Sequence, residues 1–137
     1  LAPRALTAEL RKIHQYMVFS VNTPIQYAYA DFLNDARRYL ELPAFYQAKR
    51  DRFLELIRES RFRPLPCHGT YYQMLGYDAI SNEPEMAFAR RLTVDHGVAA
   101  IPPSVFYHDR DDHRVLRFCF AKKEETLVAA AERLCAI

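Results

Sequence analysis

The sequence has few of the features that mark nucleotide-binding loops, disulfide-stapled domains and membrane segments. Its 137 residues include three glycines and no tryptophan, and the glycines form neither a GxGxxG nor a P-loop pattern. The three cysteines are widely spaced and lack a CxxC pair, which favours a reducing compartment. No apolar stretch approaches the roughly 20 residues of a membrane-spanning helix. We therefore expect a cytoplasmic protein with no membrane partner.

Charge is also unremarkable in amount and distribution. The chain has 19 Lys+Arg and 17 Asp+Glu, for a formal net charge of +2, with the two signs interspersed. Nucleic-acid binders concentrate positive charge in one run or on one face, so no nucleic-acid partner is expected. Half of the residues are hydrophobic, which is too many for a disordered chain and enough for a packed core.

Apolar periodicity predicts three helices in the first 60 residues. The segment 4–17 has one helical stripe, formed by Leu6, Leu10, Ile13 and Met17. A capping box at Thr23, with Pro24 at the first helical position, opens a second helix that is expected to end before Pro43. A third helix is expected from Pro43 to Ser60.

The period changes after Ser60. A strand is expected at 70–75, and a helix at 81–97 with Ser81 or Asn82 as its cap and Gly97 as its stop. Two short strands around a polar loop and a final helix should follow. The resulting order, α-α-α-β-α-β-β-α, predicts an α+β unit in the second half of the chain.

For two clusters of reactive side chains, a structural interpretation is favoured over a functional one. The loop HDRDDHR at 108–114 contains metal-ligand types, but they crowd a predicted hairpin tip where polar residues collect anyway, so no metal is expected. Cys67 and His68 could be a nucleophile and its base. Adjacent strand residues point to opposite sides, however, which favours a structural role for both.

Arg117 is the charged residue that demands an explanation. It lies in VLRFCF (115–120), where Val115, Arg117 and Cys119 should share one strand face. Both faces are mainly apolar, so we expect the strand to be covered on both sides. A guanidinium there needs a carboxylate or phosphate that accepts two parallel hydrogen bonds. An internal Asp or Glu and a ligand anion both remain open on this pattern.

Three segments of the sequence form a joint pattern: HQYMVFSVNTPIQYAYADFL (14–33), HGTYYQML (68–75) with GVAAIPPSVFY (97–107), and VLRFCFAKKEETLVAAAERL (115–134). Together they resemble the C-terminal part of a fold-type I, pyridoxal phosphate (PLP)-dependent class I/II aminotransferase. They are similar to the methionine and kynurenine/glutamine aminotransferase subgroup, in order and with compatible spacing.

The resemblance implies an α+β fold derived from an α/β parent. Residues 1–42 would end the large PLP-binding domain, 43–60 would form a connecting helix, and 61–137 would form the small C-terminal domain. The opening LAPRAL has no initiator Met and no signal peptide. We therefore expect the chain to be part of a longer polypeptide.

The resemblance also implies an activity, the transfer of an amino group from a Met, aromatic or Gln-like amino acid to a 2-oxo acid. Arg117 would bind the substrate α-carboxylate. Phe19 would line the side-chain pocket of the neighbouring subunit in a homodimer, although a hydrophobic staple ahead of the Thr23 cap is an equal alternative for it. Tyr72 and Ser20 are weaker pocket candidates.

The resemblance assigns no catalytic, metal-binding or cofactor-binding residue to this chain. Neither Lys12 nor Lys49 matches the lysine that forms the Schiff base with PLP, so the isolated chain should be inactive. Two alternatives remain. One is a related PLP enzyme, such as a C–S β-lyase or an aminocyclopropane-carboxylate synthase-like protein. The other is a non-enzymatic α+β binding domain in which Arg117 pairs internally.

Overall fold

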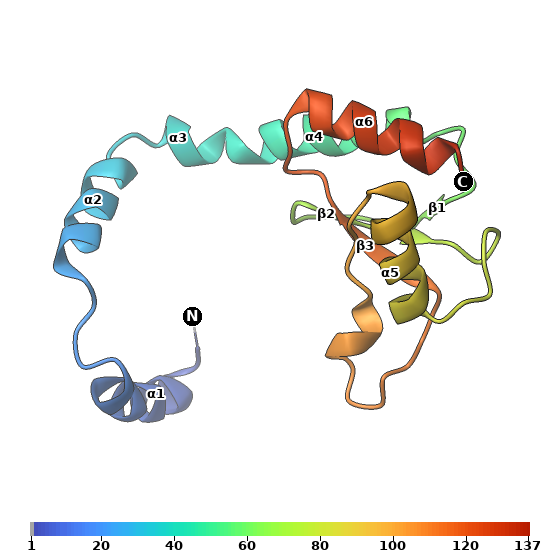
Figure 1. Cartoon of the computed structure of the whole chain (residues 1–137). Coiled ribbons are helices and arrows are strands. Elements are labelled where there is room, and N and C mark those ends of the chain that lie inside the picture. Colours follow the sequence, from blue (N-terminus) through green and yellow to red (C-terminus); the bar gives the residue numbers. More distant parts are fainter. Residues whose placement is uncertain (1) are drawn as a thin grey trace. The chain divides into compact units, whose positions relative to one another are not determined.

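The computed structural model describes residues 2–137 and divides the chain into two units, one ending at Leu42 and the other spanning Pro43–Ile137. The first unit contains α1 (Arg4–Met17), α2 (Thr23–Leu33) and α3 (Arg37–Leu40) (Figure 1). None of the three helices has a buried residue. The predicted stripe on α1 is present, but its four apolar side chains are each more than half exposed. The assignment of this unit to a large domain stays a prediction.

The second helix differs from its prediction at both ends. Asn22, not Thr23, is the N-cap, because its Oδ1 accepts a hydrogen bond from the Ile25 N–H at 3.2 Å. The helix also ends at Leu33, earlier than the expected end just before Pro43. The Asp35 carboxylate accepts hydrogen bonds from the backbone and side chain of Arg37, both at 3.3 Å. Such a local side-chain bond offers the backbone an alternative to the helix.

The second unit is an α+β layer structure, as predicted. Its elements are α4 (Leu42–Leu56, which begins at the boundary), β1 (Arg63–Pro64), β2 (Tyr72–Gly76), α5 (Glu85–His96), the 3₁₀ helix η1 (Pro103–Phe106), β3 (Val115–Cys119) and α6 (Glu124–Cys135). The three strands form an antiparallel sheet in the order β1-β2-β3. In residues 2–137 no helix is long and apolar enough to cross a membrane.

The predicted strand before the polar loop does not form. Only Ile101 pairs with β3, through an isolated bridge to Arg117. Pro102 and Pro103 follow at once, and a proline has no N–H to donate to a sheet. The chain instead turns into η1, so the loop 108–114 joins η1 to β3.

The hydrophobic core lies on one face of the sheet. It is covered by α4, α5 and α6, and α4 and α6 lie side by side above the sheet in Figure 1. An ion pair between Arg52 and Glu124 (2.7 Å) also joins these two helices. The main buried side chains are Phe53, Phe62, Leu75, Phe88, Leu92, Leu116, Phe118, Leu127 and Leu134. Helix α4, which we expected to connect two domains, therefore contributes to the core of the second unit.

The other face of the sheet is only partly covered. Tyr72 and Met74 of β2 and Arg117 and Cys119 of β3 lie on it, and all four side chains are of intermediate exposure. The expectation that β3 is covered on both sides is therefore confirmed only in part: Val115, on this same face, is buried, whereas Arg117 and Cys119 are half-buried. This open face is where Arg117 lies.

Gly97 ends α5 in the left-handed conformation, with φ of 65°. A side chain is disfavoured there, because Cβ approaches the following carbonyl oxygen. We expect Gly97→Ala to lower the free energy of unfolding by about 1 kcal/mol, as measured by urea denaturation. Gly69→Ala is the matched control, since a Cβ at Gly69 would meet no atom within 4 Å. Equal losses from both variants would contradict the prediction.

Candidate functional site

Arg117 lies among aromatic rings on the open face of the sheet. Its guanidinium carbon is 4.3 Å from the ring centroid of Tyr72 and 5.3 Å from that of Phe106. The strand register explains the first contact: Arg117 pairs with Met74 and Cys119 pairs with Tyr72, so Tyr72 is a diagonal neighbour of Arg117 on the same face. Phe106 comes from η1. Both contacts are within the range of cation–π attraction.

Within residues 2–137, Arg117 forms no ion pair with an acid. The ion pairs among residues 2–137 all involve other side chains. The Arg117 Nε atom is buried and has no hydrogen-bond partner within this part of the chain. A buried donor left without a partner costs free energy. The arrangement therefore has unused capacity for an acceptor.

Tyr72 does not supply the missing negative charge. The pKa of its hydroxyl is raised above the ordinary value, first by hydrogen bonding with Tyr71 and then by burial, whereas Arg117 acts in the opposite direction. The phenol is thus neutral at physiological pH. Its contact with Arg117 is a cation–π contact and leaves the guanidinium charge uncompensated.

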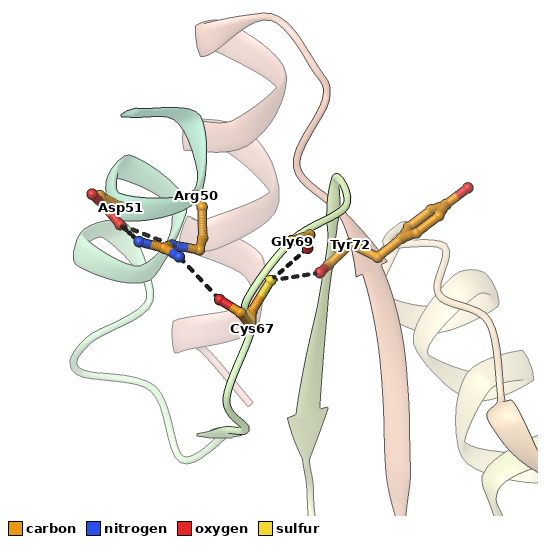
Figure 2. Close-up of polar contacts among 5 residues, drawn as sticks. All are labelled: Arg50, Asp51, Cys67, Gly69 and Tyr72. Atoms are coloured by element: carbon orange, nitrogen blue, oxygen red, sulfur yellow. Dashed lines mark hydrogen bonds and ion pairs between the residues drawn. The ribbon is translucent and has the colours of Figure 1, made fainter. Parts of the chain in front are cut away.

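The turn before β2 is anchored by Cys67 and Arg50 (Figure 2). The Cys67 Sγ atom lies 3.1 Å from the carbonyl oxygen of Gly69 and 3.3 Å from that of Tyr72. Arg50 donates a hydrogen bond to the Cys67 carbonyl at 3.0 Å and pairs with Asp51 at 2.7 Å. Figure 2 shows the Tyr72 side chain pointing away from this thiol.

These contacts give Cys67 a structural role at the entry to β2. Its thiol contacts backbone carbonyls, and the neighbouring His68 is exposed to solvent. No hydrogen bond joins the two side chains in the described part of the chain. They do not form a nucleophile–base pair.

The loop 108–114 is more than a solvated turn. Asp112 Oδ2 accepts a hydrogen bond from the Glu85 N–H at 2.6 Å and so satisfies the first turn of α5. The cap predicted at Ser81 or Asn82 is therefore wrong: the N-cap residue is Pro84, and the side-chain acceptor comes from 27 residues downstream. Across residues 2–137 there is no group of three or more side chains placed to hold a metal ion.

Phe19 and Ser20 belong to the first unit, whereas Arg117 and Tyr72 belong to the second. Phe19 is 91% exposed and has a φ of 62°, an uncommon value for a residue with a side chain. Because Asn22 is the N-cap, the position before the cap is Val21, so the staple proposed for Phe19 does not form. The pocket roles of Phe19, Ser20 and Tyr72 stay predictions.

Sequence reasoning missed two residues near Arg117. Phe106 lies within GVAAIPPSVFY, but nothing in that pattern places its ring against a guanidinium. Glu85 lies in the first turn of α5, but no sequence pattern predicts that it is fully buried. The contact of Phe106 with Arg117 and the hydrogen bonds of Glu85 each join segments that are distant in sequence, so no local periodicity predicts them.

Comparison with known proteins decides the family. Residues 1–134 match the family described as Aminotransferase class I and II. The chain belongs to this family. It is 53% identical over 135 residues to the methionine aminotransferase of Escherichia coli (strain K12), covering 98% of this chain and 35% of that protein. It is 31% identical to a kynurenine–oxoglutarate transaminase of Dictyostelium discoideum, covering 98% of this chain and 36% of that protein.

The fold agrees with that of solved aminotransferases. A crystal structure of the E. coli protein YbdL, described as having a methionine aminotransferase function, superimposes with a TM-score of 0.92 at 51% identity. The match covers all of this aminotransferase chain and 36% of that one. The chain thus spans about a third of the length of the relatives that it matches. Its structural neighbours have the type I fold, and the family implies PLP as cofactor.

Proposed function

We propose that this chain supplies the substrate-carboxylate site of a PLP-dependent aminotransferase, with Arg117 as the binding group. The observation that carries the proposal is the Arg117 guanidinium itself, which lies against two aromatic rings with a buried Nε that has no partner among residues 2–137. An α-carboxylate accepts two parallel hydrogen bonds from a guanidinium. A bound carboxylate would provide the acceptor that the Arg117 Nε atom lacks and would compensate the positive charge of the guanidinium.

The neighbours of Arg117 suit this task. Tyr72 and Phe106 contact the guanidinium carbon without competing for its hydrogen bonds. A carboxylate held in two bonds has its Cα–H in a defined direction, which removes orientational freedom before the reaction. Arg117 therefore binds and orients the amino acid, and other groups must move the proton.

The residues of this chain fit the substrate of a PLP enzyme rather than the cofactor. PLP, when bound, supplies the electron sink for the bond cleavage at Cα. The two lysines that precede β1 are engaged elsewhere: Lys12 pairs with Glu9 at 2.8 Å, and Lys49 donates to the Lys122 carbonyl at 2.6 Å. The family resemblance assigns the Schiff-base lysine to neither of them.

The proposed substrates are an amino acid with a Met, aromatic or Gln-like side chain and a 2-oxo acid. Apolar side chains at Phe19 and Tyr72 favour such a donor, and the relatives named above include a methionine aminotransferase and a kynurenine–oxoglutarate transaminase. Phe19 would reach the pocket of a second copy, in a cytoplasmic homodimer.

The decisive experiment is product analysis with the full-length protein, expressed with whatever sequence precedes and follows these residues in its gene. Methionine, phenylalanine and glutamine are each supplied with a 2-oxo acid and PLP. We expect the amino group to appear on the 2-oxo acid. Release of free ammonia instead would identify a lyase or a synthase-like enzyme of the same fold. Absence of any PLP-dependent reaction would favour a binding domain.

A polypeptide of these 137 residues alone should be inactive. We expect no amino transfer when it is mixed with PLP, methionine and a 2-oxo acid, because the family resemblance assigns the Schiff-base lysine to no residue of this chain. The absorbance of PLP added to the polypeptide should also equal that of PLP mixed with free amines in the absence of protein. A PLP absorbance change that methionine reverses would contradict this prediction.

A further inference from the structure

Glu85 is a buried carboxylate in the first turn of α5, with no exposed surface. Its Oε2 accepts a hydrogen bond from the Ser104 N–H at 2.8 Å. Its Oε1 accepts bonds from the N–H groups of His113 at 3.1 Å and Val115 at 3.2 Å. An ionised carboxylate can only accept hydrogen bonds, and three backbone donors meet that need.

Two of the donors belong to the segments that contact or contain Arg117. Ser104 lies in η1, two residues before the Phe106 ring that contacts the guanidinium. Val115 begins β3, two residues before Arg117 and on the same strand face. Ile101 and Arg117 exchange two backbone hydrogen bonds, at 2.9 and 3.0 Å. Glu85 thus joins η1, which carries Phe106, to the start of β3, the strand that carries Arg117.

Asp112 completes the connection in the opposite direction. The Glu85 carboxylate accepts hydrogen bonds from the N–H groups of His113 and Val115, which follow Asp112. In return, the Asp112 carboxylate accepts a hydrogen bond from the Glu85 N–H. Asp112 also accepts from the Arg114 N–H at 2.9 Å, and Arg114 has a left-handed φ of 54°. A residue with a side chain adopts that conformation only where its surroundings determine it. The segment from 112 to 115 is therefore held in one conformation by two carboxylates.

We infer that Glu85 is a positioning residue for the Arg117 site, one that sets the relative placement of Arg117 and Phe106 without touching the substrate. The inference rests on the proposed function of Arg117. It adds that the affinity for the substrate carboxylate depends on a buried acid that makes no contact with the substrate. The Glu85 carboxylate acts by accepting three backbone N–H hydrogen bonds, and not by a direct electrostatic interaction with the ligand.

Glu85→Gln tests the inference, because the amide keeps the size of the side chain but replaces one acceptor oxygen with a donor. At least one backbone N–H then faces an NH₂ group and loses its bond. In the full-length protein we expect KM for the amino acid to rise roughly tenfold, with kcat changed by less than about threefold. Amide hydrogen exchange should quicken at Ser104 and Val115. The Arg117 Nε–H resonance, observed by ¹⁵N NMR, should shift.

Glu83→Gln is the matched control. Glu83 lies two residues away and pairs with Arg91 at 2.6 Å, and it makes no hydrogen bond to 103–106 or 113–115 in the described residues. It should leave KM and both local readouts unchanged. If Glu85→Gln does not fold, Glu85→Asp replaces it: both acceptor oxygens remain on a shorter side chain, and a smaller rise in KM is expected.

The outcomes separate this inference from the proposed function. If Arg117→Gln raises KM and the Glu85 variants do not, the positioning role is wrong and the carboxylate site stands. A lower melting temperature with unchanged KM would likewise make Glu85 purely structural and overturn the inference. If Arg117→Gln itself leaves KM unchanged, both fail.

Discussion

Replacing Arg117 with glutamine should lower kcat/KM for the amino acid donor by roughly 100-fold or more, since each charge-assisted hydrogen bond contributes about 1.5–3 kcal/mol. Glutamine removes the positive charge and the two parallel donors while keeping part of the side chain. The burial of the Nε atom and the absence of an acid beside it in residues 2–137 make substrate the expected partner. Steady-state kinetics of the full-length protein measure the effect.

Two further variants sharpen this result. Arg117→Lys keeps a positive charge but loses the planar pair of donors, so its kcat/KM should lie between those of the wild-type protein and Arg117→Gln. Arg90→Gln, on the exposed surface of α5, removes an equal charge away from the site and should leave kcat/KM within about threefold. Arg117→Gln with near wild-type kcat/KM would rule out the carboxylate role.

The largest loss of stability is expected for Phe88→Ala. Phe88 has no exposed surface, its ring stacks on Tyr77 at 4.2 Å between centroids, and it lies 6.3 Å from the Phe62 ring. Removing it leaves a cavity beneath α5 and should lower the free energy of unfolding by about 3–5 kcal/mol. That is a large fraction of the stability of a small domain, about 5–15 kcal/mol. Urea denaturation followed by circular dichroism measures it.

Phe45→Ala is the control for Phe88→Ala. Phe45 lies on α4 and is 51% exposed, so less apolar surface returns to water and no cavity forms. Its loss should stay below about 1 kcal/mol. Comparable losses for the two variants would mean that the buried cluster around Phe88 does not carry the stability of the second unit.

Local sequence was sufficient where one element determines its own form. The helix α1 with its apolar stripe, the start of α4 near Pro43, the Gly97 stop and the final helix were all predicted, because each depends on spacing of a few residues. The strand alternation around Arg117 was also correct: Leu116 and Phe118 are buried in the core, and Arg117 is not. The family resemblance came from motifs in register and is confirmed by the comparisons.

Local sequence failed where the partner is distant. The cap of α5 comes from Asp112, which is 27 residues away, and the buried Glu85 is bonded to residues 19 to 30 positions downstream. The early end of α2 was also missed, since the competing bond from Asp35 has no periodic signal. The strand expected before the loop was lost to the consecutive prolines at 102 and 103.

The sequence by itself therefore determined the family, the main helices, and the presence of one arginine in an apolar strand. Only the tertiary structure decided what surrounds that arginine within residues 2–137: two aromatic rings, no acid, and a frame of backbone joined by Glu85. The physical reason is that hydrophobic period and capping act over a few residues. The partners of a buried charge are chosen by the packing of segments that are far apart in the chain.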